Sequence, residues 1–146
     1  MKSFLDTSVL VAGFYSDHEH HDSSAALLLR QKPSSGCTAA HCLAEFYATV
    51  TGMPGKNRAA PGEALLFLHD VADRLASISL EPRDYADVFE KSAGAGISGG
   101  TIYDALIARC AIKSGAEAIF TLNAKHFRLL GPEVASRVRP PPKPNG

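Results

Sequence analysis

This sequence contains few cysteines, and it has neither a surplus of one charge nor a long apolar stretch. Its three cysteines, Cys37, Cys42 and Cys110, include no CxxC pair and are odd in number. This pattern argues against a disulfide scaffold or a structural zinc site and favours a reducing compartment. Lysine plus arginine total 15, as do aspartate plus glutamate, so the net charge is zero. That balance argues against a general nucleic-acid coat protein, which would be basic.

No apolar run approaches the length of a membrane span, so we expect no membrane association. The run after Lys2 is too short for a signal peptide and contains Asp6. A chain of 146 residues, 45% of them hydrophobic, has room for one domain with a substantial core. We expect a cytoplasmic protein with one domain over residues 1–138 and a disordered proline-rich tail over residues 139–146. Regular hydrogen bonding should already fail from Val138 onward, because prolines follow at 140, 141, 142 and 144.

Apolar runs separated by turn residues predict strands that alternate with helices. The first strand should end at Asp6, and further strands are expected over 37–39, 75–80 and 118–122. Helices are expected over 7–14, 23–31, 41–51, 63–72, 82–93 and 101–114, with a loop over 123–127. This alternation indicates the α/β class, with a mainly parallel sheet, helices on both faces and right-handed crossovers.

Asp6 is the first candidate functional residue. It ends an apolar run and is followed by Thr7 and Ser8. In open α/β sheets, ligands bind outside the carboxyl ends of the strands, near a topological switch point. Asp6 is therefore expected where chemistry is usually done. The alternative is that Asp6 only caps the next helix, and this stretch alone leaves both open.

Two more acids lie on predicted helices. The 101–114 helix is apolar nearly all round, which predicts burial, yet it contains Asp104. A buried carboxylate needs a partner. Arg109, five positions away, lies off its face, so a metal ion is the better candidate and a backbone amide the alternative. Glu45 borders the apolar face of the 41–51 helix, where it could also be simply solvated. Together with Asp6, these acids offer hard oxygen ligands that suit Mg²⁺ or Mn²⁺ rather than zinc.

In their order and spacing, these motifs resemble those of PIN-domain ribonucleases, most closely the VapC-like toxins of bacterial toxin–antitoxin pairs. The motifs are Phe4 to Leu10 around Asp6, Glu45 on a helix, Tyr103 to Ala108 around Asp104, and Thr121-Leu122-Asn123 with Phe127. The resemblance extends to about Leu130. It implies a three-layer α/β/α sandwich and an endoribonuclease whose Asp6, Glu45 and Asp104 bind Mg²⁺ or Mn²⁺. It also implies that the first strand lies beside the fourth, so that Asp6 and Asn123 flank one cleft.

The sequence departs from the family pattern after the last expected strand. Asn123 and His126 stand where acids are often found, which leaves open whether a second ion binds. Side chains expected to support a ligand or its water are Thr7, Ser8 and Thr121. The family implies an RNA substrate, a small inhibitory antitoxin and a homodimer. Lys56, Arg58, Lys125 and Arg128, all near predicted loops, are candidates for phosphate contacts, with a solvated surface as the alternative.

Other interpretations are tested by particular residues. A haloacid-dehalogenase-type phosphotransfer domain would need a second aspartate two positions after Asp6, where Ser8 stands. A receiver-like signalling domain would need an aspartate ending a central strand, and 37–39 and 75–80 supply none. A PIN-fold RNA-binding or interaction protein without activity remains open. His18, His20 and His21 invite a metal hypothesis, but they lie within four positions with no distant partner, which favours a solvated helix entry.

Overall fold

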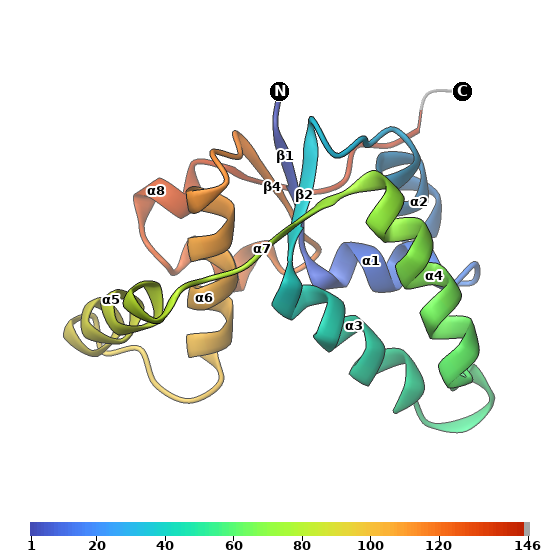
Figure 1. Cartoon of the computed structure of the whole chain (residues 1–146), viewed down its shortest axis with the longest axis horizontal. Coiled ribbons are helices and arrows are strands. Elements are labelled where there is room, and N and C mark those ends of the chain that lie inside the picture. Colours follow the sequence, from blue (N-terminus) through green and yellow to red (C-terminus); the bar gives the residue numbers. More distant parts are fainter. Residues whose placement is uncertain (145–146) are drawn as a thin grey trace.

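The computed structural model describes residues 1 to 144 and has a parallel sheet between two layers of helices (Figure 1). The chain runs through β1 (Ser3–Leu5), α1 (Thr7–Phe14), α2 (His21–Leu29), β2 (Gly36–Ala39), α3 (Ala40–Thr51), the short 3₁₀ helix η1 (Gly55–Asn57), α4 (Pro61–Arg74), β3 (Ala76–Ile78), α5 (Pro82–Gly94), α6 (Thr101–Lys113), β4 (Ala118–Phe120), α7 (Ala124–Arg128), α8 (Pro132–Ala135) and β5 (Val138–Arg139). None of the helices in the described part of the chain is long and apolar enough to cross a membrane.

The five strands lie in the order β3-β2-β1-β4-β5, and every neighbouring pair is parallel. Phe4 at the centre of β1 is in register with Cys37 of β2 and Ile119 of β4. After β1 the chain forms β2 and β3 on one side of β1 in the sheet, and β4 then pairs with the other side of β1. The switch point therefore falls between β1 and β4, whose carboxyl ends lie next to each other. The expected parallel sheet and the pairing of the first strand with the fourth are both confirmed.

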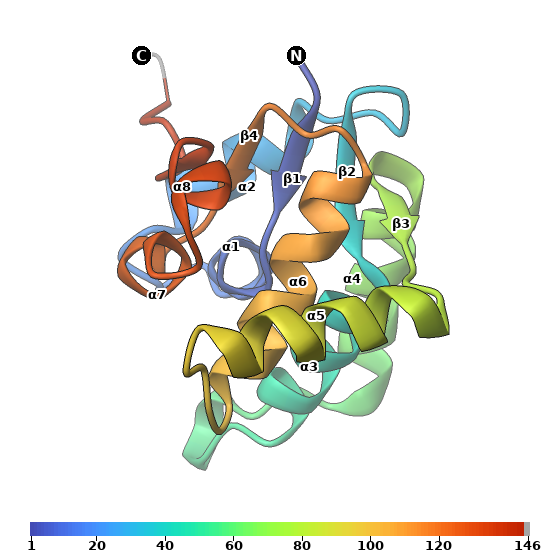
Figure 2. The ribbon, with the colours of Figure 1, turned by 90° about the vertical axis from the view of Figure 1, so that its left-hand side faces the viewer.

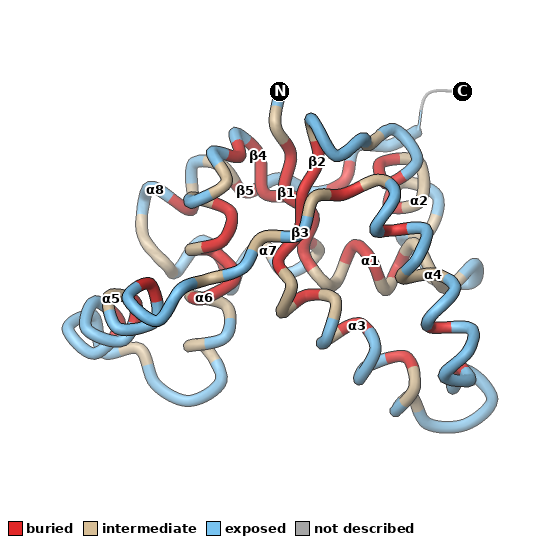
Figure 3. The backbone as a smooth tube through the Cα atoms, viewed as in Figure 1, coloured by how far each residue is buried: buried red, intermediate tan, exposed pale blue. Residues whose placement is uncertain are grey.

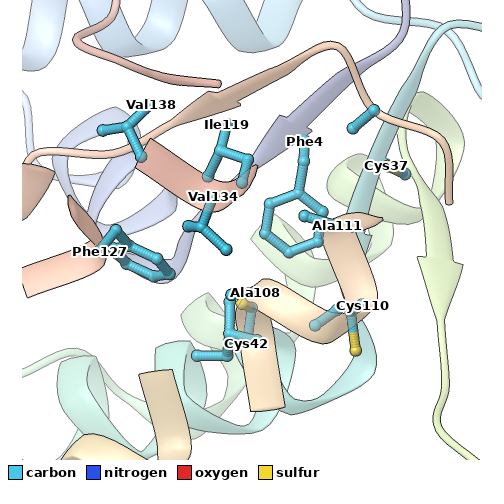
Figure 4. Close-up of a cluster of buried hydrophobic side chains, with 13 residues drawn as sticks. Phe4, Cys37, Cys42, Ala108, Cys110, Ala111, Ile119, Phe127, Val134 and Val138 are labelled. Atoms are coloured by element: carbon cyan, nitrogen blue, oxygen red, sulfur yellow. The ribbon is translucent and has the colours of Figure 1, made fainter. Parts of the chain in front are cut away.

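Alternate residues of the strands feed two separate hydrophobic clusters, because successive strand side chains point to opposite faces. Phe4 and Ile119 belong to the cluster under α6, α7 and α8, where they lie near Ala111 and Val134 (Figure 4). Leu5 and its neighbours in the strands belong to the cluster under α1, α2, α3 and α4. Figure 2 shows α6 packed over the strands and α5 lying across α6. The α/β/α sandwich implied by the family resemblance is thus confirmed.

All three cysteines are free and buried, which agrees with the interpretation that the chain has no disulfide scaffold. Burial raises the pKa of Cys42 to about 12 and that of Cys110 to about 11. The thiols are therefore protonated and unreactive at neutral pH, and they serve as small apolar side chains in the core.

Two segments near the carboxyl end differ from the expectation. The 123–127 segment is not a loop: α7 forms there, anchored by buried Phe127. Regular hydrogen bonding does not fail at Val138, because β5 pairs with β4 and the Thr121 amide donates to the Arg139 carbonyl at 3.1 Å. Val138 and Arg139 precede the prolines and occupy a sheet edge, where ladder bonds are needed on one side only. Of the expected tail, residues 145 and 146 lie outside the described residues.

Several helix boundaries also shift from the expected ones. α2 begins at His21 rather than Ser23, and α4 covers Pro61–Arg74 rather than 63–72. The sequence pattern missed α8 entirely, since its four residues are too few for a periodic signal.

Most of the surface of helix α5 is exposed, and its buried residues are Asp84, Val88 and Ser92 (Figure 3). Ion pairs add to its contact with α6. Asp84, only 7% exposed, lies 3.0 Å from the Lys113 ammonium and 3.3 Å from the Arg109 guanidinium. Arg109 also donates to Asp87 at 2.6 Å. The Glu81 amide, followed by Lys113 and Arg109, holds the pKa of Asp84 at about 2. Arg109 therefore pairs with acids of α5. It does not pair with Asp104, as the spacing of five positions between them had indicated.

Asp84→Asn should lower the urea midpoint of unfolding at neutral pH. A folded-state pKa below the usual value means that ionised Asp84 stabilises the fold above about pH 4 and loses this effect as the pH falls toward 2. The difference between wild type and variant should accordingly shrink over that range in denaturation series at successive pH values. Asp73→Asn, at an exposed α4 residue without an ion pair in residues 1–144, is the control. A pH-independent difference would contradict this account.

Candidate active site

Asp6 lies at the carboxyl end of β1 and is only 3% exposed. Its Oδ2 accepts hydrogen bonds from the Ser8 and Thr121 hydroxyls, both at 2.9 Å. Although Asp6 occupies the cap position of α1, its side chain makes no capping hydrogen bond, so the cap-only interpretation does not describe it. Burial raises the pKa of Asp6, and the bonds from Thr121 and Ser8 oppose that shift only in part.

The two hydroxyls that bind Asp6 also accept hydrogen bonds from the backbone. The Leu122 amide donates to Ser8 Oγ, and the Asn123 amide donates to Thr121 Oγ1, both at 2.9 Å. The carboxylate is thus tied through two side chains to the segment that follows β4. This arrangement fixes the two strand ends of the switch point relative to each other.

Glu45 lies in the second turn of α3 and is half-buried. Its Oε1 accepts a hydrogen bond from the Thr7 hydroxyl at 2.9 Å, across 38 positions of sequence. Its Oε2 lies 3.9 Å from Nε2 of His41, one turn earlier on the same helix. Glu45 is therefore held beside the residue that follows Asp6, and the interpretation of a freely solvated helix residue is wrong.

Asp104 lies in the first turn of α6 and is half-buried, in contrast to the full burial expected for this helix. The buried surface begins at Leu106, whereas Tyr103 is exposed. Within residues 1–144 the Asp104 carboxylate has neither a hydrogen-bond partner nor an ion pair. Burial raises its pKa, nearby His126 opposes this shift, and the charge of Glu45 adds to it. Neither a backbone amide nor Arg109 partners this acid.

The three acids thus come from the end of β1, from α3 and from α6. Glu45 is linked to the residue after Asp6 by the Thr7 hydroxyl, and its charge acts on Asp104. Among the described residues, no three side chains of histidine, cysteine, aspartate or glutamate are arranged closely enough to hold a metal ion together. Three carboxylates without a cation repel one another, which keeps such side chains apart. The donors are all hard oxygens, and this donor set suits Mg²⁺ or Mn²⁺.

Known proteins share this fold. The family model described as the PIN domain matches residues 3–131. This chain belongs to the PIN domain family. Ribonuclease VapC40 of Mycobacterium tuberculosis is 32% identical over 114 residues, covering 78% of this chain and 81% of that protein.

Two solved structures are similar to this PIN domain. VapC20 of Mycobacterium tuberculosis, described as a sarcin-ricin loop cleaving toxin, superposes with a TM-score of 0.68 at 14% identity, covering 86% of this chain and 92% of that chain. VapBC2 of Rickettsia felis, bound to a DNA fragment from the promoter, gives 0.62 at 20% identity, covering 94% and 96%. Family membership confirms the resemblance found in the sequence and excludes the receiver-like and dehalogenase-type alternatives.

The four basic residues predicted to contact phosphates fall into two groups in this PIN domain. Lys125 and Arg128 are exposed on α7, directly after β4, and the intervening His126 lies close enough to Asp104 to affect its pKa. Lys56 and Arg58 follow the far end of α3, away from the strand ends (Figure 1). The first group is thus near the acids, and the second group is not.

The histidine segment after α1 borders the site without forming a metal cluster in the described residues. His18 Nδ1 accepts the His20 amide at 3.0 Å, and His21 Nδ1 donates to the Ala12 carbonyl at 2.9 Å. A cavity of about 430 Å³ opens beside these rings. Its walls include His18 and His20 together with Thr7, Ser8, Val11, Glu19, Thr49, Leu122 and Asn123.

Two aromatic residues at the site were not expected from the sequence. The rings of His41 and Tyr103 stack with centroids 5.6 Å apart and an interplanar angle of 10°. A weak signal existed, because His41 precedes Glu45 by four positions and Tyr103 directly precedes Asp104. Only the packing of both helices against β2 brings the two rings together.

Thr121→Val should destabilise the protein by about 1–3 kcal/mol, because it leaves the Asn123 amide without its acceptor and removes one of the two hydroxyl donors to Asp6 Oδ2. Thr121→Ser keeps the hydroxyl and should lose much less. Urea denaturation of both variants at the same pH measures the difference. Equal losses would show that packing of the methyl group, rather than the hydrogen bonds, determines the effect.

Proposed function

We propose that this PIN domain is a Mg²⁺- or Mn²⁺-dependent endoribonuclease that hydrolyses RNA phosphodiesters as the toxin of a toxin–antitoxin pair. The observation that carries the proposal is the set of three acids around the switch point, in which Asp104 makes neither an ion pair nor a hydrogen bond among residues 1–144 and only His126 opposes its raised pKa. The identity of 32% with a ribonuclease over 78% of the chain supports the choice of reaction.

The site residues fit a divalent ion bound partly through water. Mg²⁺ usually keeps several waters and takes one or two protein carboxylates, so acids that are not in mutual contact are compatible with it. When bound, such an ion supplies an activated water and neutralises charge on the phosphate. In our proposal Asp6, Glu45 and Asp104 hold the ion, Ser8 and Thr121 orient Asp6, and Thr7 orients Glu45. Asn123 and His126 provide no second acidic set, so we propose a single ion.

The partners follow from the same site. The similarity to VapBC2 supports a small antitoxin whose basic side chain would pair with Asp6 and Glu45 in place of the metal ion. We also infer a homodimer in the cytoplasm. Exposed aromatic surface for self-association lies on α3 and α5, at Tyr47, Tyr85 and Phe89. Phe67 on α4 does not belong to this surface, because it packs against Phe14 and Phe46 within the chain.

Asp104→Asn should abolish RNA cleavage while the protein stays folded. The substitution removes the negative charge that an ion would bind, but it alters a half-buried residue without a hydrogen-bond partner in residues 1–144, so the fold loses little. Cleavage of a mixed RNA in Mn²⁺ is measured beside circular dichroism. Asp73→Asn, on exposed α4 surface, is the control and should cleave normally. Wild-type rates from folded Asp104→Asn would refute the proposed site.

Asp6→Asn should raise the thermal midpoint of the metal-free protein. The raised pKa of Asp6 means that its ionised form destabilises the fold, increasingly as the pH rises above the ordinary carboxyl value. Relief of about 1 kcal/mol would shift the midpoint by roughly 2–4 °C in a domain of this size. Mn²⁺ at a hundredfold excess over its dissociation constant should stabilise the wild type by about 2.7 kcal/mol and the variant much less.

The thermal midpoints of the wild type and of Asp6→Asn are measured in chelator and in Mn²⁺. Midpoints of the variant that are lower by the same amount in both conditions would mean that Asp6 is structural and binds no ion.

A further inference from the structure

A stacked aromatic pair lies beside the acids on the two helices that carry Glu45 and Asp104. His41 belongs to the first turn of α3, one helical turn before Glu45, and Tyr103 belongs to the first turn of α6, next to Asp104. Their rings are nearly parallel, at 10°, with centroids 5.6 Å apart. In Figure 1 these two helices stand on opposite sides of the central strands. The stacked rings link the first turns of the two helices.

The pair is not explained by the hydrophobic core. Tyr103 is 53% exposed, whereas Phe4, Phe46 and Phe127 are almost fully buried. The Tyr103 hydroxyl has no hydrogen-bond partner in the part of the chain that the structure describes. A large aromatic ring in water contributes little to folding, and stacking on His41 limits its motion. A ring held in advance binds a ligand at a smaller entropic cost.

The surface next to His41 is hollow rather than flat. His41 forms part of the wall of a cavity of about 260 Å³, lined mainly by apolar side chains from β3, α5 and α6. The apolar lining consists of Ala40, Ile78, Leu80, Tyr85, Leu106 and Cys110. The cavity borders His41 but not Tyr103, so a planar group stacked on the pair would have this apolar hollow next to it on the His41 side only.

The charge of the protein also favours RNA binding through stacked bases. The net charge is zero, and the site itself is acidic, so attraction of the phosphate backbone by the protein is weak. Contacts with bases would therefore add to the affinity that Lys125, Arg128 and a bound ion can supply to the phosphates. Unpaired nucleotides are recognised by stacking on aromatic side chains, and each stacked base is worth about 1–3 kcal/mol.

We propose that Tyr103 and His41 form a stacking platform for the base of one unpaired nucleotide next to the scissile phosphate. The platform positions single-stranded RNA over Asp104 and Glu45 and disfavours paired RNA, whose bases are not free to stack. This assignment rests on the proposed ribonuclease function.

The test compares Tyr103→Leu with Tyr103→Phe, because leucine keeps apolar bulk and phenylalanine keeps the aromatic face. On an unpaired oligonucleotide in Mn²⁺, Tyr103→Leu should raise KM roughly 5- to 150-fold with kcat nearly unchanged. Tyr103→Phe should remain close to wild type. Substrates with one abasic nucleotide should reveal a single position whose loss costs the wild type the same factor and costs Tyr103→Leu nothing more.

Three results would overturn the platform: an unchanged KM in Tyr103→Leu, a lower kcat with constant KM, or an abasic penalty of equal size in both proteins. Affinity for the uncleaved oligonucleotide, measured by fluorescence anisotropy in the Asp104→Asn background, separates this proposal from the proposed function. A wild type that cleaves no RNA would refute the ribonuclease. Equal RNA affinity with and without Tyr103→Leu would refute the platform, and a loss of affinity by the predicted factor would support it.

Discussion

The buried carboxylate of Asp6 is the constraint around which the site is built. A carboxylate that is 3% exposed needs hydrogen-bond donors, and Ser8 and Thr121 provide them from two different segments. Since both hydroxyls also accept backbone amides from the segment after β4, satisfying Asp6 fixes the ends of β1 and β4 together. The same burial keeps the acid short of compensating positive charge, and a divalent cation would supply that charge.

Much of the fold follows from local sequence patterns. Apolar runs and their spacing identified the four longer strands and six of the helices, and the order of the acid motifs identified the PIN family. Asp6, Asp104 and Glu45 stood out because carboxylates on apolar elements need an explanation. β5 and α7 were missed for physical reasons: the strand has only two residues, and the helix depends on one anchor, Phe127.

The contacts inside the site were beyond the reach of sequence patterns. The Thr7–Glu45 hydrogen bond spans 38 positions, and the His41–Tyr103 stack joins two helices whose proximity depends on the whole sheet. A basic residue near a predicted loop also gave no information on its distance from the site. Lys56 follows the far end of α3, whereas Lys125 lies shortly after β4. Local composition reports which residues are unusual, and only tertiary packing reports which of them meet.

Cleavage of RNA by this chain should depend on a divalent ion held at Asp6, Glu45 and Asp104. The most direct measurement is digestion of a defined total RNA by the full chain in Mn²⁺ and in chelator, followed by sequencing of the new ends. The account predicts internal cuts at recurring positions in Mn²⁺ and none in chelator. Intact RNA in Mn²⁺, or the same cuts in chelator, would contradict it.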